Sequence, residues 1–200
     1  MTSIWERIEQ SRKRWNVLRH PFYQRWSAGE LTRDELSRYS GQYRHAVEAI
    51  AVVSEAAADA APDHPELRAH AAEEREHTAL WDGFMESAGG SATAPTPETQ
   101  ACLRAWTSGD DVLGHLIRLY AIESGQPEIS LTKRQGLLER YGFEEGPGTE
   151  YFRVHESRDS EHAAEARRLV ERLAADADAD ALVAAAESAF RANWRLLDGV

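Results

Sequence analysis

Three segments of the chain carry side chains that could bind a metal on the apolar face of an expected helix. In segment 151–162, His155, Asp159 and His162 stand four and three residues apart, which is the spacing of helix neighbours. The same face continues through Tyr151 and Ala166, so we expect it to be buried. Buried imidazoles and carboxylates must be paired or bound to a metal. The alternative is a pair of exposed histidines beside an ion-paired Asp159.

Two further segments add fewer candidate ligands. Glu123 stands among large apolar residues, where a lone carboxylate needs a metal or an arginine from a facing helix. Glu74 and His77 form Glu-x-x-His, the pair that helical di-metal carboxylate proteins place on one face. Glu73 competes with Glu74, but the helical angle relative to Trp81 favours Glu74. Because charge-rich runs are commonly solvated, an exposed face is the alternative here.

Taken together, the three segments offer three carboxylates and three imidazoles. This oxygen and nitrogen donor set suits non-haem iron or manganese and leaves positions open for dioxygen. Cys102 is the only cysteine, which excludes an internal disulfide and a thiolate metal cluster.

The segments that must position these residues all have helical patterns. Thr32 and Glu35 form a capping box at the start of a long helix. Residues 89–97 form a loop that is too short to indicate a domain boundary. We therefore expect an all-α protein with a single domain over residues 1–200. The expected helices span residues 4–15, 22–26, 32–60, 66–88, 98–106, 110–126, 129–141, 149–175 and 181–197.

Composition restricts the partners of the chain. Its 200 residues include 34 acidic and 23 basic side chains, a net charge of -11. This balance argues against nucleic acid as a partner and against a polybasic membrane anchor. No apolar run approaches the roughly 20 residues of a membrane span, and no signal-peptide core follows Met1. We expect no membrane association and a cytoplasmic location.

The chain resembles the haem-oxygenase-like di-metal oxidases, a group that includes the CADD-like p-aminobenzoate synthases. Thiaminase-like and pyrroloquinoline-quinone-synthesis proteins are its neighbours. The resemblance covers nearly the whole chain and rests on HPFYQRWSAGELTRDELSRYSGQY, EEREHTALWDGF, LYAIESGQPEISLTK and YFRVHESRDSEHAAE. It implies a haem-oxygenase-like bundle of about seven helices, two iron ions (or iron with manganese) and dioxygen as co-substrate. The ligands it implies are Glu74, His77, Glu123, His155, Asp159 and His162.

The resemblance leaves the substrate open. Our main expectation is a homodimeric di-iron oxidase that oxidises a small-molecule substrate resembling an amino acid. The alternative is the CADD-like reaction, in which the enzyme uses its own tyrosine and lysine as the source of p-aminobenzoate. Tyr23 and Lys133 match those positions and are its candidate catalytic residues, although core packing and a solvated helix face would also explain them. Ile122 replaces the tyrosine that precedes the metal-binding glutamate in that branch, which argues against this alternative.

Two other classes compete with an oxidase. A thiaminase-like hydrolase needs a cysteine nucleophile in the core, whereas Cys102 lies in a short helix beside the loop. A non-catalytic binding or regulatory protein is the other class, because a ligand set permits chemistry without requiring it.

Overall fold

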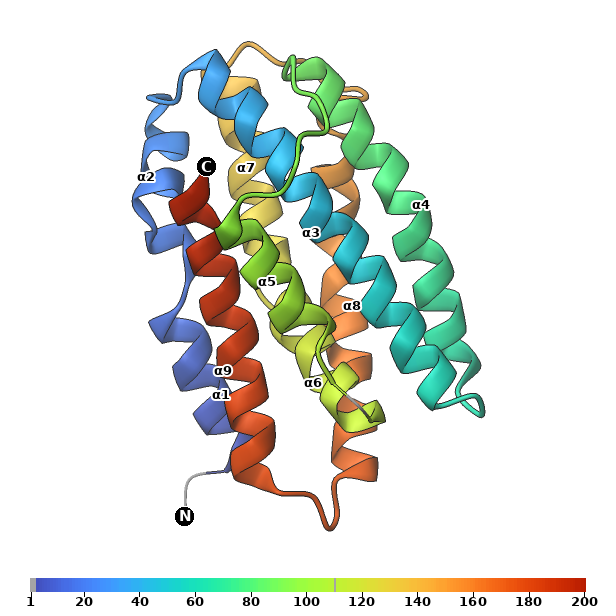
Figure 1. Ribbon diagram of the computed structural model, residues 1–200. Coiled ribbons are helices and arrows are strands. Elements are labelled where there is room, and N and C mark those ends of the chain that lie inside the picture. The colour runs from blue at the N-terminus through green and yellow to red at the C-terminus, as the bar shows by residue number, and fades with distance from the viewer. Residues whose placement is uncertain (1–2, 110) are drawn as a thin grey trace.

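The computed structural model describes residues 3–109 and 111–200, which form nine α-helices and two short 3₁₀-helices (Figure 1). No strand occurs in these two ranges, so the all-α prediction is confirmed. The elements are α1 (Ile4–Arg14), η1 (Val17–Arg19), α2 (Pro21–Ala28), α3 (Arg33–Ala60), α4 (Pro65–Ser87), α5 (Pro97–Thr107), α6 (Val112–Glu123), α7 (Gln126–Arg140), α8 (Glu150–Leu173), α9 (Ala179–Leu196) and η2 (Leu197–Gly199).

Local sequence signals explain where the helices begin. Thr32 Oγ1 accepts from the backbone N–H of Glu35 at 3.2 Å, and Glu35 accepts in return at 2.8 Å, so the predicted capping box is confirmed. Prolines open α2, α4 and α5, at a position where the missing N–H is not needed. These starts make α2 and α5 separate short helices, which raises the number above the seven or so that the resemblance implied.

The boundary between α6 and α7 determines the position of Glu123, one of the predicted ligands. Pro127 lies in the first turn of α7, so α6 ends at Glu123 and places this carboxylate at its last residue. Asp111 caps the N-terminus of α6: its Oδ1 accepts from the N–H of Gly114 at 2.7 Å. The predicted start at Asp110 lies outside the described residues.

Helix α8 lies beside the other helices that carry predicted ligands. It packs against α4, α6 and α7, while α3 and α4 lie side by side as an antiparallel pair (Figure 1). The three helices that carry the predicted ligands are therefore neighbours. None of the described helices is both long enough and apolar enough to span a bilayer.

A close contact joins α2 to α7. The indole N–H of Trp26 donates to the backbone carbonyl of Lys133 at 3.1 Å. A Cβ on Gly136 would lie 2.6 Å from Trp26 Nε1, so only glycine at this position lets the indole approach. This contact sets the distance between α2, which carries Tyr23, and α7, which carries Lys133.

We expect Gly136→Ala to lower the free energy of unfolding by about 1–3 kcal/mol, because an overpacked site must shift its neighbours. Urea unfolding measures the change. Gly125→Ala is the matched control, since its Cβ would meet only Ile129 Cδ1, at an ordinary 3.5 Å. Equal stability of the two variants would contradict the steric argument.

Candidate metal centre

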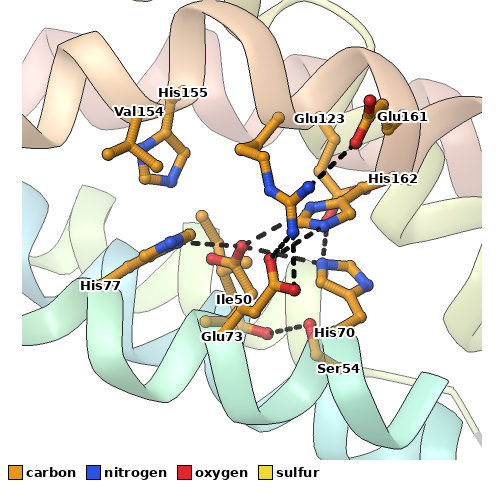
Figure 2. Close-up of polar contacts among 12 residues, drawn as sticks. Ile50, Ser54, His70, Glu73, His77, Glu123, Val154, His155, Glu161 and His162 are labelled. Carbon is orange, nitrogen blue, oxygen red and sulfur yellow. Dashed lines mark hydrogen bonds and ion pairs between the residues drawn. The ribbon is translucent and has the colours of Figure 1, made fainter. Parts of the chain in front are cut away.

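Three helices bring the predicted ligands into one buried cluster. Figure 2 shows His155 and His162 of α8 pointing toward His77 and His70 of α4. Every predicted ligand is at most 7% exposed. The predicted burial of these helix faces is therefore confirmed, and the solvated alternatives are wrong.

The donor atoms form two groups that share one carboxylate. Within each group they lie within 4.8 Å of one another. The first group is Glu74, His77 and His155, and the second is His70, Glu74, Glu123 and His162. Because Glu74 belongs to both groups, its carboxylate is the one suited to bridging two metal ions.

His70 is a candidate ligand that sequence reasoning missed. Its Nε2 lies 2.9 Å from Glu123 Oε1, and its ring centroid lies 4.0 Å from that of His162. His70 precedes Glu74 by four residues and His77 by seven, which keeps all three on one face of α4. That spacing was the available signal, but His70 stands outside the Glu-x-x-His pattern.

Asp159 belongs to neither group, so its role as a ligand stays a prediction. It is 1% exposed, and its Oδ1 has no hydrogen-bond partner in the part of the chain that the structure describes. Burial raises the pKa of Asp159 well above its ordinary value, and the charges of Glu123 and Glu74 raise it further. Such a carboxylate needs a nearby cation to ionise.

The position of Glu73 bears on the choice between the two adjacent glutamates. Its side chain is 34% exposed and both its oxygens lie 2.7 Å from Arg158 Nη2. The side chain of Glu74 is buried, and its Oε1 lies 3.1 Å from His77 Nδ1. The geometry therefore favours Glu74 as the ligand.

Burial keeps two of the imidazoles neutral. It lowers the pKa of His155 to about 4. Burial also lowers the pKa of His162 to about 4, and the positive charge of His70 adds to this effect. Neutral imidazoles offer the lone pair that a metal requires.

The remaining buried charges balance one another. Burial alone would lower the pKa of His70, but the carboxylates of Glu123 and Glu74 raise it to about 10. Burial would raise the pKa of Glu74, but hydrogen bonds with His70 and His77 hold it below the usual range. The buried carboxylates of Glu74 and Glu123 therefore favour a cation at the centre of the cluster.

Several inward atoms lack partners, and their chemistry fits a metal. Glu123 Oε2, His155 Nε2 and His162 Nδ1 are buried without a hydrogen bond from any described residue. Burying such atoms unpaired is costly. Imidazole nitrogens with carboxylate oxygens are a donor set for iron or manganese.

The two candidate catalytic residues lie in an adjoining aromatic cluster. Lys133 is 0% exposed, so the solvated-face explanation for it is wrong. Its Nζ has no hydrogen-bond partner among the described residues and lies 5.5 Å from the ring centroid of Tyr23. The Tyr23 hydroxyl lies 2.8 Å from that of Tyr39. The other rings within 6 Å of this Nζ are those of Tyr39, Tyr43, Trp81 and Phe152.

The charge state of Lys133 follows from this position. Burial lowers its pKa to about 7, although the Asp159 carboxylate partly opposes the shift. Near neutral pH a large fraction of this amine is therefore uncharged. An uncharged amine has the lone pair that makes it a nucleophile.

We expect Lys133→Met to stabilise the protein in a pH-dependent way. The folded-state pKa is depressed from 10.5 to about 7, so the wild type is penalised below pH 7 and the penalty fades as the pH rises toward 10.5. The expected gain is about 4 kcal/mol near pH 6.5 and about 1 kcal/mol near pH 9.5.

Urea unfolding at the two pH values measures this gain. The exposed Lys13 provides the control Lys13→Met, which should change stability little at either pH. A pH-independent effect of Lys133→Met would show that this amine is charged and compensated in the folded protein.

A tyrosine lies against the cluster although position 122 is isoleucine. The ring of Tyr151 stacks on that of His155 with centroids 3.9 Å apart. Its hydroxyl is buried and has no hydrogen bond within the described residues. This tyrosine comes from α8 rather than from the position before Glu123, where Ile122 is buried.

Cys102 lies in a poor environment for a nucleophile. It is fully buried in α5, and burial raises the pKa of its thiol above the ordinary value. Because the thiolate is the reactive form, this position disfavours the thiaminase-like reaction.

Comparisons with known proteins show which family the chain matches. Residues 66–194 match a protein family described as "Iron-containing redox enzyme". The matched range includes every candidate ligand and Lys133, but not Tyr23.

Two relatives carry the same name. A 4-aminobenzoate synthase of Nitrosomonas europaea is 31% identical over 96% of this chain and 87% of its own length. A 4-aminobenzoate synthase of Chlamydia muridarum is 30% identical over 92% of this chain and 84% of its own length. Among solved structures, the TenA homologue from P. horikoshii covers 96% of both chains with a TM-score of 0.71. At 16% identity, this likeness shows the fold alone, which is the haem-oxygenase-like fold that the sequence predicted.

Proposed function

Because the chain belongs to the family of iron-containing redox enzymes, we propose that it is a 4-aminobenzoate synthase that consumes its own Tyr23 and Lys133. The names of its relatives support 4-aminobenzoate as the product, over oxidation of an added, amino-acid-like substrate. That Tyr23 and Lys133 are its source is what the resemblance implies. The alternative expectation from the sequence thus becomes the preferred one.

One observation carries the proposal: the buried amine of Lys133 lies among aromatic side chains, of which Tyr43 is the nearest, with its centroid at 4.5 Å, and one is the ring of Tyr23. Its Nζ lies 5.5 Å from that ring and is surrounded by aromatic carbon without a hydrogen-bond partner among the described residues. A charged lysine at a purely structural position would normally reach water or a carboxylate. An uncharged Lys133 amine near the phenol of Tyr23 is suited to transferring its nitrogen to that ring.

The atoms of the product match the two side chains. In 4-aminobenzoate a benzene ring carries one carboxyl carbon and, opposite to it, a nitrogen. The ring and Cβ of Tyr23 supply the carbon skeleton: the Cα–Cβ bond breaks, and dioxygen is the oxidant that converts Cβ to the carboxyl carbon. Nζ of Lys133 supplies the nitrogen: it bonds to Cζ of Tyr23, the phenolic oxygen leaves as water, and the Cε–Nζ bond breaks as Cε is oxidised to an aldehyde. The hydrogen bond between the hydroxyls of Tyr23 and Tyr39 orients the ring while the amine approaches it.

The buried cluster would hold two metal ions, both iron or iron with manganese. Glu74 would bridge them, His77 and His155 would bind one, and His70, Glu123 and His162 would bind the other, with Asp159 beside them. When bound, the metals supply the reduction of dioxygen that makes oxidation of the phenol possible. The protein positions the ligands and excludes water from the reactants. Tyr151, stacked on His155, places a tyrosine beside the cluster, although position 122 is isoleucine.

The purified protein itself tests the proposal. Given Fe(II), a reductant and dioxygen but no organic substrate, it should release 4-aminobenzoate, detected by mass spectrometry, and stop at about one molecule per chain. Product that appears only after a small molecule is added, or that exceeds one per chain many times, would favour the external-substrate oxidase instead. A protein that binds no metal and forms no product would favour the non-catalytic class.

A further inference from the structure

The two ring nitrogens of His162 face two adjacent glutamates of α4. Nδ1 lies 3.8 Å from Glu74 Oε1, inside the cluster, and Nε2 lies 3.4 Å from Glu73 Oε2, at its rim. Nδ1 is buried without a hydrogen-bond partner among the described residues, while Glu73 is partly exposed. The imidazole thus separates an inner carboxylate from an outer one.

His155, a second candidate ligand, also has one inward and one outward ring nitrogen, but its outward nitrogen faces a backbone carbonyl. His155 Nδ1 lies 2.6 Å from the backbone carbonyl of Tyr151 and donates its N–H there, which leaves Nε2 as the inward, unprotonated nitrogen. Metal-binding histidines commonly fix their tautomer by donating the other N–H to a carbonyl or carboxylate. In His162 the inward nitrogen is Nδ1, so the outer donor must be Nε2–H, and Glu73 is the carboxylate that faces it.

Arg158 holds Glu73 in this position. Its Nη2 contacts both oxygens of Glu73 at 2.7 Å, and its Nη1 contacts Glu161 at 3.0 Å. Because Arg158 precedes His162 by four residues on α8, the arginine and the imidazole point to the same place on α4. Arg158 of α8 therefore holds Glu73 of α4 beside His162, which lies on the same helix as the arginine.

We propose that Glu73 is a positioning residue rather than a metal ligand: it accepts the Nε2 proton of His162 and so presents Nδ1 to the metal. The inference rests on the metal centre of the proposed function. It assigns the two adjacent glutamates separate tasks, with Glu74 binding metal and Glu73 selecting the tautomer of a neighbouring ligand.

Nitrogen NMR of the histidine rings in metal-free protein tests the tautomer directly. His162 should carry its proton on Nε2 in the wild type and become a mixture of tautomers in Glu73→Ala. Glu73→Gln should restore much of the wild-type pattern, because its amide oxygen still accepts. Glu161→Ala is the matched control, since it removes the other acidic partner of Arg158 and should leave the tautomer unchanged. An unchanged tautomer in Glu73→Ala would overturn the inference.

Anaerobic Mn(II) titration, followed by the EPR signal of free Mn(II), tests the consequence. Glu73→Ala should bind about 10–100-fold more weakly while still reaching the wild-type number of ions at saturation. Wild-type affinity in Glu73→Ala would overturn the positioning role, and loss of a whole ion at saturation would make Glu73 a ligand instead. A wild type that binds no Mn(II) would overturn the metal centre itself, and is thereby distinguished from failure of the Glu73 variants alone.

Discussion

Tyr23→Phe and Lys133→Met are each expected to reduce formation of 4-aminobenzoate to the background level. Phenylalanine keeps the ring of residue 23 but removes the phenol that is oxidised, and methionine fills the space of residue 133 without an amine. Both variants should retain their fold, because these side chains occupy an apolar, aromatic interior. Mass spectrometry of the released product after addition of Fe(II), reductant and dioxygen makes the measurement.

The control is Lys13→Met, which removes the other lysine of the chain and should leave product formation at the wild-type level. Lys133→Met combines two expectations, since the variant should be inactive and more stable than the wild type. Repeated turnover by Tyr23→Phe would exclude a reaction that consumes Tyr23.

Glu74→Gln is expected to remove bound iron almost completely, the largest effect of any single ligand substitution. Glu74 is the carboxylate common to both donor groups, and a neutral amide cannot bridge two cations as a carboxylate does. His155→Ala, which alters one group only, should retain up to about half of the iron. Elemental analysis of anaerobically loaded protein measures both.

Glu76→Ala is the control on the same helix, because Glu76 is exposed and should bind iron normally. Thermal unfolding of each metal-free variant shows whether the fold survives. Full iron content in Glu74→Gln would contradict the bridging arrangement.

Helical spacing was enough to predict most of the fold and much of the candidate centre. His155, Asp159 and His162 share a face because their spacing follows the helix repeat, and the apolar residues along that face indicated its burial. The capping box at Thr32 and the prolines that open helices act within one turn, so they could be read locally.

Other features depend on contacts between distant segments. The burial of Lys133 arises because α2, α3 and α8 surround this part of α7, and no local pattern in its charged helix reveals it. The approach of Trp26 to Gly136 joins residues more than a hundred positions apart. The division of tasks between Glu73 and Glu74 depends on where α8 places Arg158 and His162, which spacing along α4 cannot give.

Isotope tracing shows whether the protein is its own substrate. Protein made with carbon-labelled tyrosine and ε-nitrogen-labelled lysine is loaded with iron and exposed to dioxygen together with unlabelled free tyrosine and lysine. We expect 4-aminobenzoate that carries both labels, with mass changes confined to the peptides that contain Tyr23 and Lys133. Unlabelled product, with both peptides intact, would mean that the substrate is an added molecule and not the protein.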